Sequence, residues 1–400
     1  MDTELLRRLA TPNDTKIVLC VVDGLGGLPD PRTHRSELET ANLPHLDLLA
    51  GNSVCGLTIP VDYGVTPGSG PGHMALFGYD PLQHEVGRGV LEALGIDFDL
   101  QRSDVAARGN FCTLDAQGKI TDRRAGRIPT TLTIELCERL RQIKLPGVEL
   151  IVEPVREHRF VLVMRGEGLD GSLSQTDPER EGVEPLPVRA TSPHAEATAD
   201  LAHQFVMQAR KLLSDQPQAN GLLLRGFAKH PDLPSMPEVA QMRAGAFAVY
   251  PMYRGLAKLA GMTASAGGGT QESQLDALKS HWNDFDFFFY HFKRADAAGE
   301  DGDFHAKVLA LEEFDKLVPQ LEDLGADVLM IAGDHSTPSQ MAGHSWHPVP
   351  FLLNSKLGTT DDVDQFHEAA CRRGSLGVFP ARHVLSLAMA HAGRLMKFGA

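Results

Sequence analysis

Three aspartates stand a short distance past apolar runs in this sequence. Asp23, Asp296 and Asp334 each follow, within a few residues, a run with the composition of a buried strand. Ligands of open α/β sheets bind outside the carboxyl ends of the strands, so we expect these three carboxylates to converge. Carboxylates brought together would repel one another unless a cation held them. The pattern therefore predicts a metal site.

Histidines extend this ligand set. Asp334 belongs to the segment GDHSTP, which contains His335, and His344 and His347 follow in HSWHP. A set of carboxylate oxygens and imidazole nitrogens suits Zn²⁺ or Mn²⁺, and its oxygen-rich half also suits Mg²⁺. A helix cap or a turn would explain any one of the aspartates alone. The joint pattern is what indicates bound metal.

A serine in a glycine-rich loop adds a candidate nucleophile. The segment GVTPGSGPGHMALFGYDP (64–81) places Ser69 between glycines, which let a backbone approach a phosphate and expose N–H groups to it. Serine is a weak nucleophile unless a metal or a base lowers its pKa. Ser69 near the metals would suit phosphoryl transfer. We interpret His73 as structural and the segment from His73 onward as the start of a helix.

Strands and helices must position these groups. The runs 16–22, 285–292 and 327–332 predict buried strands, and the segments 42–51 and 306–325 predict helices. Strands that alternate with helices indicate an α/β layered fold with a mostly parallel sheet.

The middle of the chain is less regular. We predict strands at 159–166 and 221–226, a helix at 197–215, and a polar loop or lid at 172–194. These features indicate a smaller α+β domain, residues 96–234, inserted into a discontinuous outer domain of residues 1–95 and 235–400.

Composition excludes some classes of protein. The chain has 400 residues, 42% of them apolar and 22% charged, which is typical of a soluble globular protein of about two or three domains. No apolar run is long enough to span a membrane, and a net charge of −14 argues against a nucleic-acid partner. The five cysteines form no CxxC pair and the N-terminus has no signal-like apolar region, so we expect a cytoplasmic protein.

Several segments together resemble one known family. VVDGLGGLPD, TPGSGPGHMALFGYDP, DRRAGRI, YPMYRGLAKLAGM and GDHSTPS stand in the order of motifs of the archaeal-type 2,3-bisphosphoglycerate-independent phosphoglycerate mutases. The likeness runs along almost the whole chain. It implies an alkaline-phosphatase-like domain with two metals, and an inserted domain that binds glycerate. It also implies interconversion of 3-phosphoglycerate and 2-phosphoglycerate through a phosphoserine on Ser69.

The resemblance also implies how the ligands are divided. One metal would be held by Asp23, Ser69, Asp334 and His335, and the other by Asp296, residue 300 and His344. The family motif often reads Asp-x-x-Gly-His, whereas this chain has Glu300 at the last position. A charged oxygen donor shifts the expected preference toward Mn²⁺ or Mg²⁺ and away from Zn²⁺. His347 is the alternative source of the missing imidazole.

Basic side chains in the middle of the chain suit a small anionic phosphometabolite. Residues 101–230 hold 18 basic and 17 acidic residues, whereas the rest of the chain holds 20 and 35. The guanidinium group matches carboxylate and phosphate in two-point contacts, although any one arginine could instead form a surface ion pair. The candidate substrate ligands are Arg108, Asn110, Arg123, Arg124, Arg127, His158, Arg159 and Arg225, with Arg254 outside this region. Lys293 is a further candidate for a phosphate contact.

Two other functions fit parts of the pattern. A metal-dependent phosphatase, or a phosphotransferase acting on another small hydroxylated metabolite, would share the metal and serine motifs. A metal-stabilised binding protein would share the metal motifs but would have no need for the serine.

Overall fold

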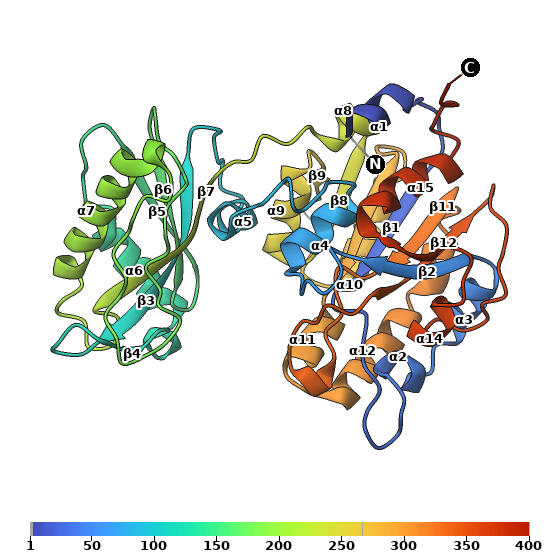
Figure 1. Ribbon diagram of the computed structural model, residues 1–400, viewed down its shortest axis with the longest axis horizontal. Helices are drawn as coiled ribbons and strands as arrows, with labels where there is room; N and C mark the ends of the chain where they lie inside the picture. Colours follow the sequence, from blue (N-terminus) through green and yellow to red (C-terminus); the bar gives the residue numbers. More distant parts are fainter. Residues whose placement is uncertain (1–2, 266, 400) are drawn as a thin grey trace. The chain divides into compact units, whose positions relative to one another are not determined.

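The longest apolar runs form the eight-stranded sheet of one unit of the protein, which combines Met1–Glu85 with Leu233–Ala400 (Figure 1). The computed structural model describes residues 3–265 and 267–399. The strands are, in their order across the sheet, β13 (Gly377–Pro380), β2 (Val54–Ile59), β12 (Val349–Ser355), β11 (Val328–Ala332), β1 (Ile17–Val22), β10 (Phe287–Phe292), β8 (Ala244–Phe247) and β9 (Thr263–Ala264).

The sheet is mostly parallel, as the sequence predicted. β1 pairs in parallel with both β10 and β11, and only β12 runs antiparallel to its neighbours. Every residue of β1, β10 and β11 is buried, because helices cover both faces of a parallel sheet. These strands therefore read as continuous apolar runs.

Helices of this unit pack on the sheet. One buried cluster joins β1, β10 and β11 to α3, α10, α12, α13 and α14. The helices are α1 (Thr3–Leu9), α2 (Glu37–Thr40), α3 (Pro44–Gly51), α4 (Ser69–Leu76), α8 (Met236–Ala240), α9 (Pro251–Leu259), α10 (Gln271–Ser280), α11 (Arg294–Glu300), α12 (Phe304–Asp315), α13 (Val318–Glu322), α14 (Glu368–Cys371) and α15 (Val384–His391), with short 3₁₀ turns at Ser339–Met341 and Ala381–His383.

The prediction of one helix over 306–325 was wrong. The segment forms α12 and α13, separated at Lys316 and Leu317. Pro319 lies in the first turn of α13, where its missing N–H costs nothing, whereas inside a continuous helix it would remove a backbone hydrogen bond.

The second unit, Val86–Asp232, contains an antiparallel sheet in which β3 pairs with β6 and β7. Helices α6 and α7 share a buried core with one face of this sheet. The elements are α5 (Arg88–Gly95), β3 (Val105–Leu114), β4 (Ile120–Asp122), α6 (Thr130–Leu140), β5 (Glu149–Arg156), β6 (Arg159–Arg165), α7 (Glu196–Leu212) and β7 (Gly221–Lys229), with 3₁₀ turns at Ala125–Arg127 and Pro193–Ala195.

Helix α5 lies in the second unit, whereas the sequence analysis assigned residues up to 95 to the outer domain. It packs on β3 and β7. A Cβ on Gly89 would lie 2.4 Å from the carbonyl oxygen of Ala106, so glycine allows this close approach. The first boundary therefore falls after Glu85, ten residues earlier than expected.

The long polar segment 172–194 is hydrogen-bonded to strands β4 and β7 of its own unit. Thr176 donates its N–H to the carbonyl oxygen of Leu224 in β7, and Ile120 of β4 donates its N–H to that of Val183.

Among the residues that the structure describes, no helix is long and apolar enough to cross a membrane.

Candidate active site and metal centre

The three central strands of the first unit explain why its acids converge. β1 lies between β10 and β11 and is parallel to both, so the carboxyl ends of the three strands adjoin. Asp23 directly follows β1, Asp334 follows β11 by two residues, and Asp296 lies in the first turn of α11 after β10. All three carboxylates are fully buried.

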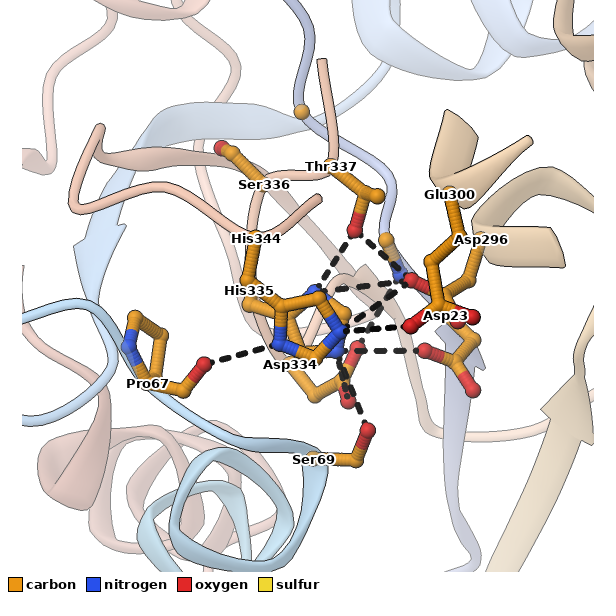
Figure 2. A network of polar contacts seen from close by, with 12 residues as sticks. Asp23, Pro67, Ser69, Asp296, Glu300, Asp334, His335, Ser336, Thr337 and His344 are labelled. Atoms are coloured by element: carbon orange, nitrogen blue, oxygen red, sulfur yellow. Dashed lines mark hydrogen bonds and ion pairs between the residues drawn. The ribbon is translucent and has the colours of Figure 1, made fainter. Parts of the chain in front are cut away.

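The first group of donor atoms surrounds the Nε2 atom of His335 (Figure 2). This nitrogen lies 3.4 Å from Asp23 Oδ1, 3.1 Å from Asp334 Oδ2 and 3.1 Å from Ser69 Oγ. The structure thus brings together the four residues that the resemblance assigned to one metal.

The second group surrounds the Nε2 atom of His344. Asp296 Oδ1 and Glu300 Oε1 each lie 3.6 Å from it. The rings of His335 and His344 stack with their centroids 3.6 Å apart, so the two groups are neighbours. His347 lies in neither group, because its Nδ1 atom is 3.0 Å from Ser345 Oγ and its ring stacks on Trp346. The geometry favours Glu300 over His347 as the third donor.

Both histidines direct their Nε2 atoms at these groups, because their Nδ1 atoms have other partners. His344 Nδ1 lies 2.9 Å from the carbonyl oxygen of Pro67, which can only accept a hydrogen bond. Thr337 donates its hydroxyl hydrogen to Asp296, so at 2.9 Å it accepts one from His335 Nδ1. A hydrogen bond from Nδ1 orients each ring so that Nε2 can bind a metal.

Unpaired oxygens indicate where a cation fits. Asp23 Oδ1 and Asp334 Oδ2 are buried and form no hydrogen bond with any described residue, and both face His335 Nε2. Burial by itself would raise the pKa of Asp334, but His335 and His73 hold it well below its usual range. Burial and the charge of Asp23 raise the pKa of Asp296. Crowded buried carboxylates with imidazole donors suit a divalent cation.

Lys293 joins the two groups. Its Nζ atom lies 3.1 Å from Asp23 Oδ2 and also pairs with Asp296. The sequence suggested a phosphate contact here, whereas this ammonium contacts two carboxylates that the resemblance assigned to the metals.

Ser69 is the first residue of α4, so this helix begins four residues before the expected start at His73. The unpaired N–H groups of a first helical turn favour an anion beside the serine. A Cβ on Gly72 would lie 2.1 Å from the carbonyl oxygen of Asp334, which shows how closely α4 packs on the metal loop. His73 is buried, with its Nδ1 atom 2.8 Å from the Ser69 carbonyl oxygen and 3.2 Å from Asp334 Oδ2.

Two residues at the site were missed in the sequence. Tyr253 donates its hydroxyl to Asp23 Oδ2, and His291 Nε2 lies 3.4 Å from the same oxygen. Burial lowers the pKa of His291 to about 4. His291 was detectable as a polar residue in an apolar strand, whereas nothing distinguished Tyr253. The expected phosphate ligand Arg254 donates to the carbonyl oxygen of Val249.

Four candidate substrate ligands share one face of the second unit's sheet. Arg108 and Asn110 are two residues apart on β3, Arg159 of β6 lies opposite Asn110, and Arg225 of β7 lies opposite Arg108. Residues directly opposite in a ladder point to the same face. This arginine face, defined by Arg108, Asn110, Arg159 and Arg225, is the face opposite the core with α6 and α7.

The arginine face carries polar atoms that lack partners. Arg108 Nε, Asn110 Oδ1 and Arg159 Nε are buried without a hydrogen bond to any described residue. Burial above all, together with the charges of Arg159 and Arg225, lowers the pKa of Arg108 to about 10 against the opposing effect of Glu92. Burial, and then Arg159, lower the pKa of His158 to about 4. The face suits an anion.

The arginines of DRRAGR have separate environments. Arg123 forms two hydrogen bonds, of 2.9 and 2.8 Å, to the buried carboxylate of Asp177, which also lies 3.4 Å from Arg225. Arg124 and Arg127 are exposed at a turn where Ala125, Gly126 and Arg127 have φ of 47°, 62° and 53°. Asp177 therefore balances part of the charge that the sequence analysis attributed to a bound anion.

Comparisons with known proteins agree with these features. The family model described as 2,3-bisphosphoglycerate-independent phosphoglycerate mutase matches residues 50–219. A protein of Thermus thermophilus named as a probable 2,3-bisphosphoglycerate-independent phosphoglycerate mutase is 46% identical over 401 residues, 99% of each chain. One of Aquifex aeolicus with the same name is 45% identical over 410 residues, covering 99% of this chain and all of the relative.

Solved structures show the same similarity. A protein from Pyrococcus horikoshii superposes with a TM-score of 0.84 at 27% identity, covering 97% of this chain and 100% of that one. The cofactor-independent phosphoglycerate mutase from Thermoplasma acidophilum superposes with a TM-score of 0.73 at 29% identity, covering 95% and 100%.

Proposed function

This chain belongs to the 2,3-bisphosphoglycerate-independent phosphoglycerate mutases, which interconvert 3-phosphoglycerate and 2-phosphoglycerate, and we propose that the phosphoryl group passes through Ser69. The observation that carries this proposal is the position of Ser69 Oγ, 3.1 Å from His335 Nε2 at the donor group of Asp23 and Asp334. A metal-binding protein without catalytic activity would have no use for a serine there.

Two groups of residues would hold divalent cations. Asp23, Ser69, Asp334 and His335 form the first, and Asp296, Glu300 and His344 form the second. The oxygen donors, with Glu300 among them, favour Mn²⁺ or Mg²⁺ over Zn²⁺. When bound, the cations would lower the pKa of the serine hydroxyl and neutralise charge on the phosphoryl group.

The residues of the chain position the reactants. Ser69 Oγ attacks the phosphorus in line, its bond to phosphorus forms as the bond to the glycerate 3-oxygen breaks, and the hydrogen lost by Ser69 is balanced by the one that the 3-hydroxyl gains. The 2-hydroxyl then takes the phosphoryl group and returns a hydrogen to Ser69. The first turn of α4 stabilises the negative charge of the phosphoserine.

The second unit binds the organic part of the substrate in this proposal. The arginine face offers Arg108, Arg159 and Arg225 to anionic oxygens and Asn110 to a hydroxyl. Arg123, Arg124, Arg127, His158 and Arg254 remain further proposed contacts. The buried donors of the arginine face that lack a partner support this assignment, since such groups cost free energy unless a ligand pairs with them.

We also propose a cytoplasmic location, which suits the five buried free cysteines.

The test is a coupled measurement of two products. Protein stripped with a chelator is incubated with 3-phosphoglycerate and Mn²⁺ without 2,3-bisphosphoglycerate, and 2-phosphoglycerate and free phosphate are followed together. We expect 2-phosphoglycerate with little phosphate, loss of turnover in Ser69→Ala, and full turnover in the surface control Ser280→Ala. Free phosphate alone would make the enzyme a phosphatase, and activity in Ser69→Ala would refute the phosphoserine.

A further inference from the structure

We propose that Tyr253 is a positioning residue for the metal centre, whose hydroxyl holds one oxygen of Asp23 so that the other faces the cation. This inference rests on the proposed function, because it concerns the ligand Asp23. It assigns a specific role to a residue that lies outside the two donor groups.

The two oxygens of Asp23 have different environments. Oδ2 accepts from the Tyr253 hydroxyl and lies 3.1 Å from Lys293 Nζ and 3.4 Å from His291 Nε2. Oδ1 is buried, forms no hydrogen bond with a described residue, and lies 3.4 Å from His335 Nε2. A carboxylate can exchange its oxygens by rotating about its Cβ–Cγ bond, so the groups at Oδ2 fix which oxygen the cation meets.

Tyr253 gives its single hydroxyl hydrogen to Asp23. Lys293 also pairs with Asp296, and neither ring nitrogen of His291 meets the geometry of a hydrogen bond. A buried phenol hydroxyl needs an acceptor, and Asp23 provides it. Loss of the hydroxyl would therefore leave Asp23 without its dedicated donor.

The ring of Tyr253 is held rigidly. It is 1% exposed, on the face of α9 that packs against the sheet, and it stacks on His291 with a centroid distance of 3.7 Å. The ring of His73 lies 4.8 Å away, and His73 itself contacts the carbonyl oxygen of Ser69. Tyr253 thus links the ligand Asp23 to the start of the helix that carries Ser69.

The two oxygens of Asp334, the second aspartate of the group, also have different environments. Asp334 Oδ1 accepts the backbone N–H of Gly24 at 3.2 Å, whereas its Oδ2 atom lies 3.1 Å from His335 Nε2 and 3.2 Å from His73 Nδ1. In each aspartate, one oxygen accepts a hydrogen bond from the protein and the other faces His335 Nε2. For Asp334 the backbone provides the donor, and for Asp23 the side chain of Tyr253 does.

The experiment compares Tyr253→Phe with the matched control Tyr290→Phe. Tyr290 is equally buried, and its hydroxyl donates to the carbonyl oxygen of Gln271 at 3.1 Å, away from the donor groups. Mn²⁺ is titrated into each full-length apoprotein by calorimetry, without substrate. We expect binding at one site to weaken about 10–100-fold in Tyr253→Phe and to be unchanged in the control, since partners of metal ligands have effects of this size.

A double-mutant cycle separates positioning from a general structural effect. In an Asp23→Ala background, Tyr253→Phe should weaken Mn²⁺ binding no further, because the acceptor of its hydroxyl is gone. Wild-type affinity in Tyr253→Phe, or an equal loss in both backgrounds, would overturn the proposal. Phenylalanine keeps the stacking on His291, and Tyr253→Leu provides a second variant without the hydroxyl if the first does not fold. Binding is measured without turnover, so failure of the mutase assay is a separate result.

Discussion

The substitution Lys307→Met should weaken the first unit more than any surface change. Lys307 is fully buried in α12, and its ammonium donates to the carbonyl oxygens of Gly26 at 2.9 Å and Thr337 at 2.8 Å. These carbonyls belong to the loops that carry Asp23 and Asp334. Lys307 therefore bridges the loop that carries Asp23 and the loop that carries Asp334.

The expected loss follows from these contacts. Two hydrogen bonds from a charged donor are worth about 1.5–3 kcal/mol each. Burial of the ammonium, which lowers the pKa of Lys307, opposes this gain, while the charges of Glu37 and Glu368 offset part of the burial cost. Methionine has a similar volume and removes the cost of burying a charge, but it leaves the Thr337 carbonyl without this donor and the Gly26 carbonyl with the Thr337 N–H alone. We expect a net loss of about 3 kcal/mol in the free energy of unfolding.

Fluorescence can measure this unit selectively. The two tryptophans of the chain, Trp282 and Trp346, both lie in the first unit, and Trp282 stacks on Phe288 of β10 at 4.6 Å. Urea unfolding of the apoprotein followed by tryptophan emission should show a lower midpoint for Lys307→Met. The control Lys279→Met removes an exposed contact with Gln320 and should change little. A loss below about 1 kcal/mol in Lys307→Met would refute this reasoning.

Three further predictions concern other parts of the protein. Glu300→His should raise the affinity for Zn²⁺ relative to Mn²⁺ in metal titrations, because it exchanges a carboxylate oxygen for an imidazole nitrogen. Gly72→Ala should destabilise the first unit by about 1–3 kcal/mol and reduce turnover, because its Cβ would lie 2.1 Å from the Asp334 carbonyl oxygen. Acid should weaken the second unit through Asp177. Burial would raise the pKa of Asp177, but hydrogen bonds from Arg123 lower it overall. Its stabilisation is then complete above the unfolded pKa of about 3.9 and is lost as the pH falls through the lower folded value.

Each of these predictions has a control. The Glu300→His variant is judged against the wild-type ratio of the two metal affinities, and an unchanged ratio would exclude residue 300 as a ligand. Gly51→Ala meets no atom within 4 Å and should leave stability and turnover intact. Circular dichroism of Asp177→Asn should show a smaller loss of stability than wild type as the pH falls below about 4, because the variant has no carboxylate to protonate at this position. An identical acid profile would contradict the role of Asp177.

Local patterns of apolar residues in the sequence predicted much of the fold. The runs that become β1, β10 and β11 were recognisable because strands buried on both faces need continuous apolar side chains. The position of α5 was not recognisable, since an amphipathic helix shows that it packs but not on which sheet. The break before α13 was marked in the sequence by Pro319, because proline favours the first turn of a new helix.

The site divides in the same way. The sequence alone determined the ligand types at the strand ends and the serine between glycines, because metal binding and phosphoryl transfer demand particular side chains at the ends of particular strands. Only the tertiary structure decided that Tyr253 and His291 support Asp23, that Asp177 pairs with Arg123, and that Glu300 faces His344 while His347 contacts Ser345. Such contacts join residues far apart in the chain. Their partners are selected by packing between elements, which no local pattern of residues encodes.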